Sequence, residues 1–251
     1  MSVTIKSARE IELMREAGRI LAIVHEELGK ALKPGMSTKE VDRLGEEIIR
    51  SYGCIPSFKN YEGYPASICV SLNEEIVHGI PSKKRIIKEG DIVSLDAGVI
   101  YKGYHSDAAR THIIGEVPEE VRKLVQVTEE SFFEGIKYAK EGNFLHQISC
   151  AIGDYAESFG FGVVRDMVGH GIGQHLHEDP QIPNYRLKSK GIKLQAGMTL
   201  AIEPMINLGT WQMEFFEDGW TCKTADRKPS AHYENTVLIT KGEPEILSLR
   251  K

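Results

Sequence analysis

Two aspartates, Asp96 and Asp107, stand on either side of a short turn in the segment SLDAGVIYKGYHSDAAR. The apolar, β-branched run before Asp96 predicts a buried strand, and Lys102-Gly103 predicts the turn of a hairpin. Pairing about this turn sets Asp96 opposite Ala109. We therefore expect the two carboxylates to lie close together on neighbouring strands.

Three further residues could contribute to the same chemistry. Glu203 ends an apolar segment, and Glu234 begins the last predicted strand. His170 closes an apolar segment that is predicted to be a strand. It stands between Gly169 and Gly171, which allow other backbone to approach closely and leave the imidazole uncovered. A buried ionised carboxylate costs several kcal/mol unless it is paired, so four acids in apolar strands need cationic partners.

The partners of these acids can be basic side chains or metal ions. The strand segments contain almost no lysine or arginine, and Arg110, the nearest candidate, can pair with only one or two of the acids. Four carboxylates and one imidazole form an oxygen-rich set, which favours two bridged cations over a single structural zinc. The set predicts manganese, iron or cobalt, with zinc as a further candidate. Two such ions can activate water for hydrolysis.

Three other histidines are candidates for the same site. His78 precedes a glycine in EEIVHGIP, and His175 and His177 follow the glycine-rich segment around His170. A histidine in a loop is most often solvated or part of the core. The local pattern favours a functional role for His78, but spacing alone does not separate His175 from His177.

The elements that would position these residues occur twice. In the first half, two helices begin with capping boxes at Ser7 and Ser37, and strands follow. In the second half, a long helix is predicted from Pro118 to near Gly142 and another over about 143–160, again followed by strands. A run of helices and then a run of strands argues against alternating βαβ units.

Matching segments of the two halves share one offset of 107 residues. They are the helix-ending glycines Gly35 and Gly142, the segments SYG at 51–53 and SFG at 158–160, and the segments GDIVSLD at 90–96 and GMTLAIE at 197–203. This offset predicts a duplication, and hence a single catalytic domain over 1–251 with halves of about 1–117 and 118–251. The expected class is α+β, with one curved antiparallel sheet, helices on its outer face, and a central cleft where Asp96 and Glu203 meet.

The overall composition limits the classes of function. The 251 residues are 41% hydrophobic, and a net charge of −5 gives no general attraction to DNA or to an anionic membrane. No apolar run is long enough to span a membrane, and the first residues lack the apolar core of a signal peptide. The four cysteines are widely spaced, so we expect free thiols and a cytoplasmic protein.

The motifs that contain these residues resemble those of the type I methionine aminopeptidases, which have the pita-bread fold. The resemblance covers essentially the whole chain and is carried by YPASICVSLNEEIVHGIP, GDIVSLDAGVIYKGYHSDAARTHIIG, GHGIGQHLHEDPQIPNY, GMTLAIEPM, and DGWTCKT followed by ENTV. The five metal-ligand positions of that family correspond to Asp96, Asp107, His170, Glu203 and Glu234. The absence of a large insertion in the C-terminal half is similar to type I rather than type II.

The resemblance implies a reaction as well as a ligand set. Two divalent ions (Co²⁺, Mn²⁺ or Fe²⁺, with Zn²⁺ as a further candidate) would be bridged by Asp107 and Glu234 and would activate water for attack on the first peptide bond. Glu203 is implied as the general base, and His78 and His177 as residues that contact the substrate. The implied activity is removal of an N-terminal methionine when the second residue is small.

The resemblance also implies an apolar pocket for the methionine side chain. The matching residues are Tyr61, Tyr64, Cys69 and Trp220, with Phe58 and Leu176 as expected neighbours. Without the resemblance, each of these would be interpreted as an ordinary core residue. The chain departs from the usual pattern of the family at Phe58, Gln174, Leu176 and Asn235, none of which is a metal ligand. These departures leave the width of the pocket open.

Two other functions are compatible with such a fold. A related peptidase that acts on X-Pro bonds normally has an extra N-terminal domain, for which 251 residues leave no room. A non-catalytic binding protein would lack metal ligands, and here all five are present. We expect a monomer whose partners are the N-termini of nascent polypeptides, with no DNA or membrane partner. The basic run at 81–88 makes the ribosome a further candidate, although a solvated loop is the favoured interpretation of that run.

Overall fold

The computed structural model describes residues 3–250, so Met1, Ser2 and Lys251 lie outside the described part. The helices are α1 (Ala8–Ala31), α2 (Thr38–Ser51), α3 (Glu119–Ile136), α4 (Leu145–Ser158) and the short 3₁₀ helix η1 (Tyr61–Gly63). The strands are β1 (Ile55–Pro56), β2 (Ile68–Leu72), β3 (Glu75–Val77), β4 (Ile92–Tyr101), β5 (Tyr104–Ile113), β6 (Gly162–Val163), β7 (Gly169–Gly171), β8 (Glu178–Ile182), β9 (Thr199–Ile202), β10 (Met205–Asn207), β11 (Met213–Phe215), β12 (Cys222–Thr224), β13 (Ser230–His232), β14 (Glu234–Leu238) and β15 (Glu245–Ile246). In each half, two helices are followed by strands, which is the predicted order.

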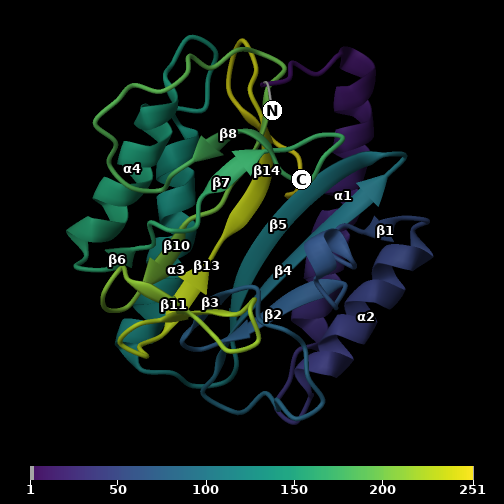
Figure 1. Ribbon diagram of the computed structural model, residues 1–251, viewed down its shortest axis with the longest axis vertical. Helices are drawn as coiled ribbons and strands as arrows, with labels where there is room; N and C mark the ends of the chain where they lie inside the picture. Colours follow the sequence, from purple (N-terminus) through teal and green to yellow (C-terminus); the bar gives the residue numbers. More distant parts are fainter. Residues whose placement is uncertain (1–2, 251) are drawn as a thin grey trace.

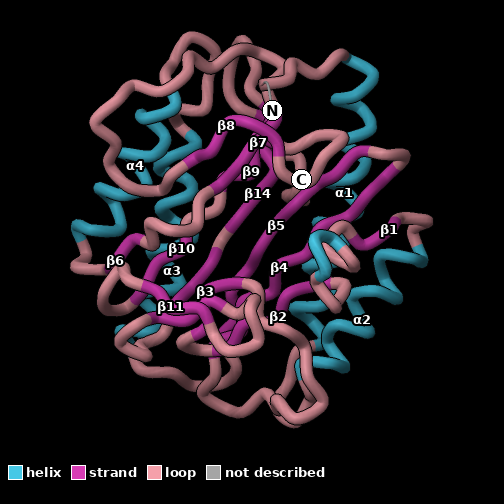
Figure 2. The backbone as a smooth tube through the Cα atoms, in the orientation of Figure 1, coloured by secondary structure: helices cyan, strands magenta, loops and turns pink. Residues whose placement is uncertain are grey.

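One large antiparallel sheet forms the centre of the molecule. Its strands follow the order β1-β4-β5-β14-β9-β7-β8, with β2 paired to β4 and β15 paired to β14. Figure 2 shows these strands as one twisted layer, and in Figure 1 the pair α1 and α2 lies on one side of the view and the pair α3 and α4 on the other. The predicted α+β class with one curved antiparallel sheet is confirmed.

The hairpin of β4 and β5 has the register expected from the sequence. Asp96 pairs with Ala109, and Asp107 lies on the partner strand two positions nearer the turn. Lys102 and Gly103 form the turn with φ values of 48° and 86°, which is the left-handed conformation that a tight two-residue hairpin requires. The turn therefore fixes which residues of the two strands face each other.

The offset of 107 residues also relates elements of the backbone. Adding 107 to the bounds of α2 gives the bounds of α4, and adding it to those of β1 gives those of β6. The isolated bridge between Ser37 and Ile86 corresponds in the same way to the bridge between Phe144 and Lys193. The similarity of the two halves thus extends from short sequence matches to hydrogen-bonded pairs.

The first helix of the second half is shorter than predicted. It ends at Ile136, whereas the sequence pattern suggested an end near Gly142. Beyond Ile136 the chain turns, Ala139 is fully buried, and the Gly142 N–H donates to the carbonyl of Leu194. These tertiary contacts replace the last predicted turns of helix.

Two strand predictions also need correction. The apolar segment before His170 was expected to be one strand, but β6 ends at Val163 and β7 begins at Gly169. Glu234 does begin β14, yet β14 is not the last strand, because β15 follows and pairs with it. Neither difference moves a predicted ligand away from the central sheet.

Each half has its own hydrophobic core beneath its helix pair. Leu21, Leu28 and Leu95 belong to the cluster of the first half, and Phe132 and Leu200 to that of the second. Strands of both halves meet in the large central sheet, and two three-stranded sheets, β13-β10-β6 and β11-β12-β3, complete the described part of the chain. Within residues 3–250, no helix is both long and apolar enough to cross a membrane.

Candidate metal centre

The thirteen residues predicted for the site all line one cavity of 130 Å³. They are Phe58, Tyr61, Tyr64, Cys69, His78, Asp96, Asp107, His170, Leu176, His177, Glu203, Trp220 and Glu234. Glu62 also lines this cavity and was not predicted. Residues from both halves therefore converge on one space, as the predicted cleft requires.

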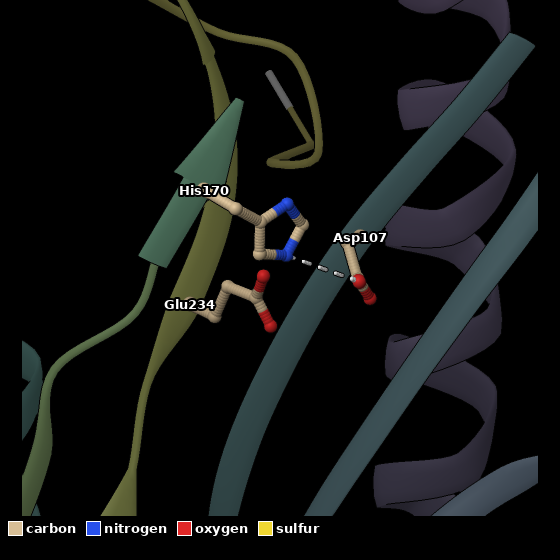
Figure 3. A group of neighbouring side chains, drawn as sticks. All are labelled: Asp107, His170 and Glu234. Carbon is tan, nitrogen blue, oxygen red and sulfur yellow. Dashed lines mark ion pairs between the residues drawn. The ribbon is translucent and has the colours of Figure 1, made fainter. Parts of the chain in front are cut away.

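Asp107, His170 and Glu234 point toward one another from β5, β7 and β14 (Figure 3). Their ligand atoms lie within 4.8 Å of one another, and Nε2 of His170 is 4.0 Å from Oδ2 of Asp107. All three side chains are buried. A separation of 4 Å is too long for a hydrogen bond. It suits two atoms that bind the same cation, each at about 2.0–2.2 Å from it.

Glu203 and Asp96 complete the predicted ligand set. Glu203 follows the end of β9 directly, and its Oε1 lies 3.6 Å from Nε2 of His170. Asp96 comes from β4, and its Oδ1 is buried without a hydrogen-bond partner in the described part of the chain. Buried polar atoms almost always have partners, so this oxygen is suited to bind a cation.

The backbone sets the orientation of His170. Its Nδ1 lies 2.8 Å from the carbonyl oxygen of Gly171. A carbonyl can only accept, so Nδ1 carries the hydrogen and Nε2 presents its lone pair to the acids. A Cβ atom would lie 2.2 Å from the carbonyl oxygen of Asp179 if added at Gly171, and 2.4 Å from that of Ala201 if added at Gly169. Both glycines are therefore required for the close approach of β7 to its neighbours.

The four carboxyl groups resist simultaneous ionisation. Burial raises the pKa of Asp96 to about 7. Burial, followed by the charges of Glu234 and Asp96, raises the pKa of Asp107. Burial and the neighbouring charge of Asp96 likewise raise the pKa of Glu203, and burial and the charge of Glu203 raise that of Glu234. A divalent cation would remove this repulsion and stabilise the anionic forms.

Basic side chains do not perform this neutralisation. Across residues 3–250, no lysine or arginine forms an ion pair with any of the four acids. Arg110, the expected candidate, donates instead to the backbone carbonyls of Ala109 and Glu234. It also donates to the side chain of Asn235 and stacks on the ring of Tyr233. The salt-bridge alternative is therefore wrong, and the donor set fits divalent cations.

His78 is held in a strained backbone conformation at the edge of the cavity. Its φ of 60° lies in the left-handed region, which non-glycine residues rarely adopt and which often occurs at functional sites. Burial, and then the neighbouring His177, lowers the pKa of His78 to about 4. The ring is therefore neutral at pH 7 and can act there as a hydrogen-bond partner.

The structure separates His177 from His175. His177 lines the central cavity, its ring centroid is 4.3 Å from that of His170, and its Nδ1 is 2.8 Å from the hydroxyl oxygen of Tyr61. His175 lines a different cavity, next to Lys6. Only one of the two histidines therefore faces the predicted ligands.

The apolar part of the cavity is formed by the residues predicted for the methionine pocket. Phe58, Tyr64, Cys69 and Leu176 are buried, whereas Tyr61 and Trp220 are partly exposed. The rings of Tyr64 and Trp220 meet edge to face, with centroids 5.2 Å apart. These side chains lie beside the acids in the same 130 Å³ space, which suits one uncharged side chain.

His232 belongs to this region and was not identified from the sequence. Its side chain is 1% exposed, and its Nε2 lies 3.7 Å from Oε2 of Glu203 and 3.9 Å from Oε2 of Glu234. The spacing of His232 and Glu234 in the sequence could have indicated that His232 faces the site. Residues two apart on an extended chain face the same side of a sheet.

Two of the departures from the family pattern have clear structural roles. Gln174 donates from Nε2 to the hydroxyl of Tyr104, at 2.8 Å. The side-chain oxygen of Asn235 accepts from Arg110 and from the hydroxyl of Ser248. Neither residue lines the central cavity.

Comparison with known proteins gives one consistent family. The sequence model of metallopeptidase family M24 matches residues 12–241 of this chain. A methionine aminopeptidase of Clostridium acetobutylicum is 55% identical, over 98% of this chain and 99% of that protein. Methionine aminopeptidase 1 of Bacillus subtilis is 52% identical, over 97% of this chain and 98% of that protein.

Solved structures agree with the sequence relatives. The methionine aminopeptidase of Thermotoga maritima superimposes with a TM-score of 0.97 at 47% identity, covering 99% of this chain and 100% of that one. The prolidase of Pyrococcus furiosus superimposes with a TM-score of 0.80 at 25% identity, covering 98% of this chain but 66% of that one. The architecture is therefore the pita-bread fold that both kinds of peptidase share.

Proposed function

The chain belongs to metallopeptidase family M24, and we propose that it hydrolyses the first peptide bond of polypeptides that begin with methionine. This proposal rests on one observation: a cavity in which four buried or partly buried acids and His170 adjoin an apolar pocket. The acids and His170 can hold the cations of a hydrolase, and the apolar pocket can hold one apolar side chain beside them. The full-length relatives named methionine aminopeptidase support the same conclusion.

We propose that the centre holds two divalent cations. Asp107 and Glu234 would bridge them, Asp96 would complete one ligand shell, and His170 and Glu203 would complete the other. The oxygen-rich set favours manganese, iron or cobalt, with zinc as a further candidate. When bound, the cations would supply Lewis acidity toward a water molecule and toward the carbonyl of the scissile bond.

The carboxylate of Glu203 is suited to move the proton in this reaction. Burial raises its pKa, which makes it a better base than an exposed glutamate. We propose that Glu203 takes a proton from the attacking water and later delivers it to the amine of the leaving peptide. His78, neutral and fixed by its backbone, would hydrogen-bond the scissile amide nitrogen or the residue after it.

The first residue of the substrate would occupy the apolar side of the cavity. Tyr61, Tyr64, Cys69 and Trp220, with Phe58 and Leu176, would enclose the methionine side chain, which is unbranched and adapts to narrow space. Because the acids lie immediately beside this slot, the bond that follows the first residue is the one presented to them. The second residue would then lie near His78, where a small side chain fits best.

We also propose how the protein is organised and where it acts. The chain would be a single catalytic domain of two similar halves, about 1–117 and 118–251, and it would act as a monomer in the cytoplasm. The four cysteines are free thiols, which suits a reducing compartment. Nascent chains are the substrates that such an activity implies, which makes the ribosome a candidate partner.

One experiment tests both the metal dependence and the bond that is cleaved. The apoprotein would be prepared with a chelator, reconstituted separately with Mn²⁺, Fe²⁺, Co²⁺ and Zn²⁺, and assayed on Met-Gly-X and Ala-Pro-X peptides. We expect metal-dependent release of methionine from the first peptide only. Asp107→Asn keeps the size of the side chain but removes its charge, so activity should fall by about 100-fold or more and one cation should bind more weakly.

The outcomes separate this function from its alternatives. Preferred cleavage of the Ala-Pro bond would assign the chain to the X-Pro peptidases of the same fold. Full turnover in the presence of chelator would contradict a metallopeptidase. Tight binding of Met-Gly-X without hydrolysis, with every metal tested, would indicate a non-catalytic binding protein.

A further inference from the structure

His232 is buried next to two predicted metal ligands, yet the protein does not fix its ring. Within residues 3–250, neither ring nitrogen has a hydrogen-bond partner, and the side chain is 1% exposed. Nε2 lies 3.7 Å from Oε2 of Glu203 and 3.9 Å from Oε2 of Glu234. A buried polar group without a partner costs free energy, so a residue of this kind in the centre calls for a function.

The carboxylate of Glu203 lies between two imidazole rings. Its Oε1 is 3.6 Å from Nε2 of His170, and its Oε2 is 3.7 Å from Nε2 of His232. Neither oxygen makes a hydrogen bond within residues 3–250, so nothing else in this part of the chain sets the rotation of the carboxylate. The two rings are therefore the groups positioned to orient it.

The two histidines differ in what holds them. The Gly171 carbonyl accepts from Nδ1 of His170, which leaves the lone pair of Nε2 facing the acids, as a metal ligand requires. Among the described residues, no backbone carbonyl holds His232 in this way. Ionised carboxylates only accept, so the ring nitrogen of His232 that faces two of them is stable there as an N–H donor.

The other side of His232 meets a second cavity. This space of 220 Å³ is lined by Arg110, Thr111, His112, Val125, Glu129, His232 and Tyr233. It has room for several water molecules at about 30 Å³ each, and its lining is polar enough to hold them. Nδ1 itself has virtually no accessible surface, so a small movement of the ring or its neighbours must open a path from this cavity before water can donate to Nδ1.

We propose that His232 is a positioning residue of the metal centre, which donates from Nε2 to the carboxylates of Glu203 and Glu234 and fixes their orientation toward the cations. The inference rests on the proposed metal-dependent function. A distance of 3.7 Å is not itself a hydrogen bond, so a small rotation of the unbonded Glu203 carboxylate must close it. Groups that orient metal ligands in this way typically contribute about 10–100-fold in metal affinity or activity.

The test compares His232→Gln, His232→Leu and the control His112→Leu. Glutamine can supply an N–H donor near the position of Nε2, whereas leucine removes the donor and keeps much of the volume. His112 lines the same 220 Å³ cavity and also has an unpartnered buried nitrogen, but it makes no ion-pair contact with the four acids. Circular dichroism and thermal unfolding would first establish that each variant is folded.

Co²⁺ binding to each apoprotein would be measured by calorimetry, together with the visible absorption of the Co²⁺ form and the kcat and KM for Met-Gly-X. We expect His232→Leu to weaken binding of at least one Co²⁺ by about 10–100-fold and to lower kcat more than it raises KM. His232→Gln should stay within about threefold of the parent with an unchanged Co²⁺ spectrum, because the donor is retained. The control should resemble the parent.

Three results would overturn the proposal. Parent-like Co²⁺ affinity and kcat in His232→Leu would remove any role for the ring. An equal loss in His232→Gln, with a changed Co²⁺ spectrum, would make His232 a ligand rather than a donor. Failure of the unaltered protein to bind Co²⁺ would reject the proposed metalloenzyme, and this inference with it.

Discussion

At His177, one ring nitrogen is occupied and the other is left for a substrate. The hydroxyl of Tyr61 lies 2.8 Å from Nδ1. When that hydroxyl donates to Nδ1, the hydrogen of the neutral ring resides on Nε2. Burial lowers the pKa of His177, so the ring is neutral at pH 7. An N–H held in this way can stabilise negative charge as it develops on a carbonyl oxygen.

Replacing His177 by alanine should therefore affect catalysis rather than metal binding. We expect His177→Ala to lower kcat by about 10²–10³-fold, as loss of one donor to a developing oxyanion does. Metal content should be unchanged, because His177 is not one of the five predicted metal ligands. Steady-state kinetics and elemental analysis of the purified variant would measure both quantities.

His175→Ala is the matched control for that variant. His175 lies two residues away but lines the neighbouring cavity beside Lys6, so its loss should change kcat far less. Equal losses in the two variants, or loss of metal in His177→Ala, would contradict the role assigned to His177.

At the scale of single residues, the sequence predicts which side chains could do chemistry better than it predicts where those side chains point. Asp96, Asp107 and Glu234 stand out because acids rarely occur in apolar strands without partners. His177 and His175 could not be separated, because the path of the loop that carries them depends on contacts with distant segments. His232 was missed although it stands two residues before Glu234, because a single histidine in a strand usually belongs to the core.

At the scale of elements, a buried ion pair joins the N-terminal segment to the first residue of β8. Nζ of Lys6 lies 2.7 Å from Oε2 of Glu178, and both side chains are 5% exposed. The hydroxyl of Thr4 donates to the same oxygen, and the backbone N–H of His175 donates to the other. Glu178 directly follows His177, so this pair anchors one end of the loop that lines the site.

Lys6→Met should destabilise the protein in a pH-dependent manner. Burial alone would raise the pKa of Glu178, but the hydrogen bonds from Lys6 and Thr4 outweigh it and hold the pKa below 4.5. The pair therefore adds stability above the ordinary glutamate pKa of about 4.3, and this stability is lost as the pH falls through the folded pKa. At pH 7 the variant leaves a buried carboxylate without its cation, at a cost of about 3 kcal/mol.

Urea unfolding of the apoprotein at pH 7 and at pH 4 would measure this cost. The difference between Lys6→Met and the parent should shrink at pH 4, where Glu178 in the variant is protonated. Adding Glu178→Gln to Lys6→Met should recover much of the loss at pH 7. Lys30→Met, which breaks the exposed pair with Glu26, should cost no more than about 0.5 kcal/mol. A loss that is the same at both pH values would show that Lys6 acts through packing alone.

Element boundaries were predictable where local signals decide them. Ser7 and Ser37 form the predicted capping boxes, and the turn at Lys102-Gly103 sets the hairpin register. The end of α3 was not predictable, because burial of Ala139 and contacts with distant strands decide it. The break between β6 and β7 has the same origin, since β6 pairs with β10 and β7 with β8 and β9.

At the scale of the whole molecule, neither half contains a complete site. Asp96 and Asp107 come from the hairpin of the first half, and His170, Glu203 and Glu234 come from the second. Pairing of β5 with β14 joins the halves and aligns Glu234 with Ala109. The repeat in the sequence predicted this arrangement because two similar sheets bury their edges most simply against each other.

The arrangement also limits which substrates fit. The 130 Å³ cavity and a neighbouring space of 360 Å³ share His78, His170, His177 and Glu203 as lining residues. A peptide whose first side chain fills the smaller cavity must therefore continue between these four side chains. A large second side chain should collide there, whereas a small one should pass.

The peptides Met-Ser-Val-Thr-Ile and Met-Lys-Val-Thr-Ile test this limit directly. The first copies the chain's own first five residues, and the second differs only at the position that must pass the constriction. Metal-loaded protein should remove one methionine from the first peptide and stop at serine, because serine does not fill the apolar pocket. Cleavage of the second should be slower by about 100-fold or more, since a misplaced reacting bond loses the benefit of fixed geometry. Mass spectrometry of timed samples would follow both products. Similar rates for the two peptides, or continued trimming past serine, would indicate a broad aminopeptidase instead.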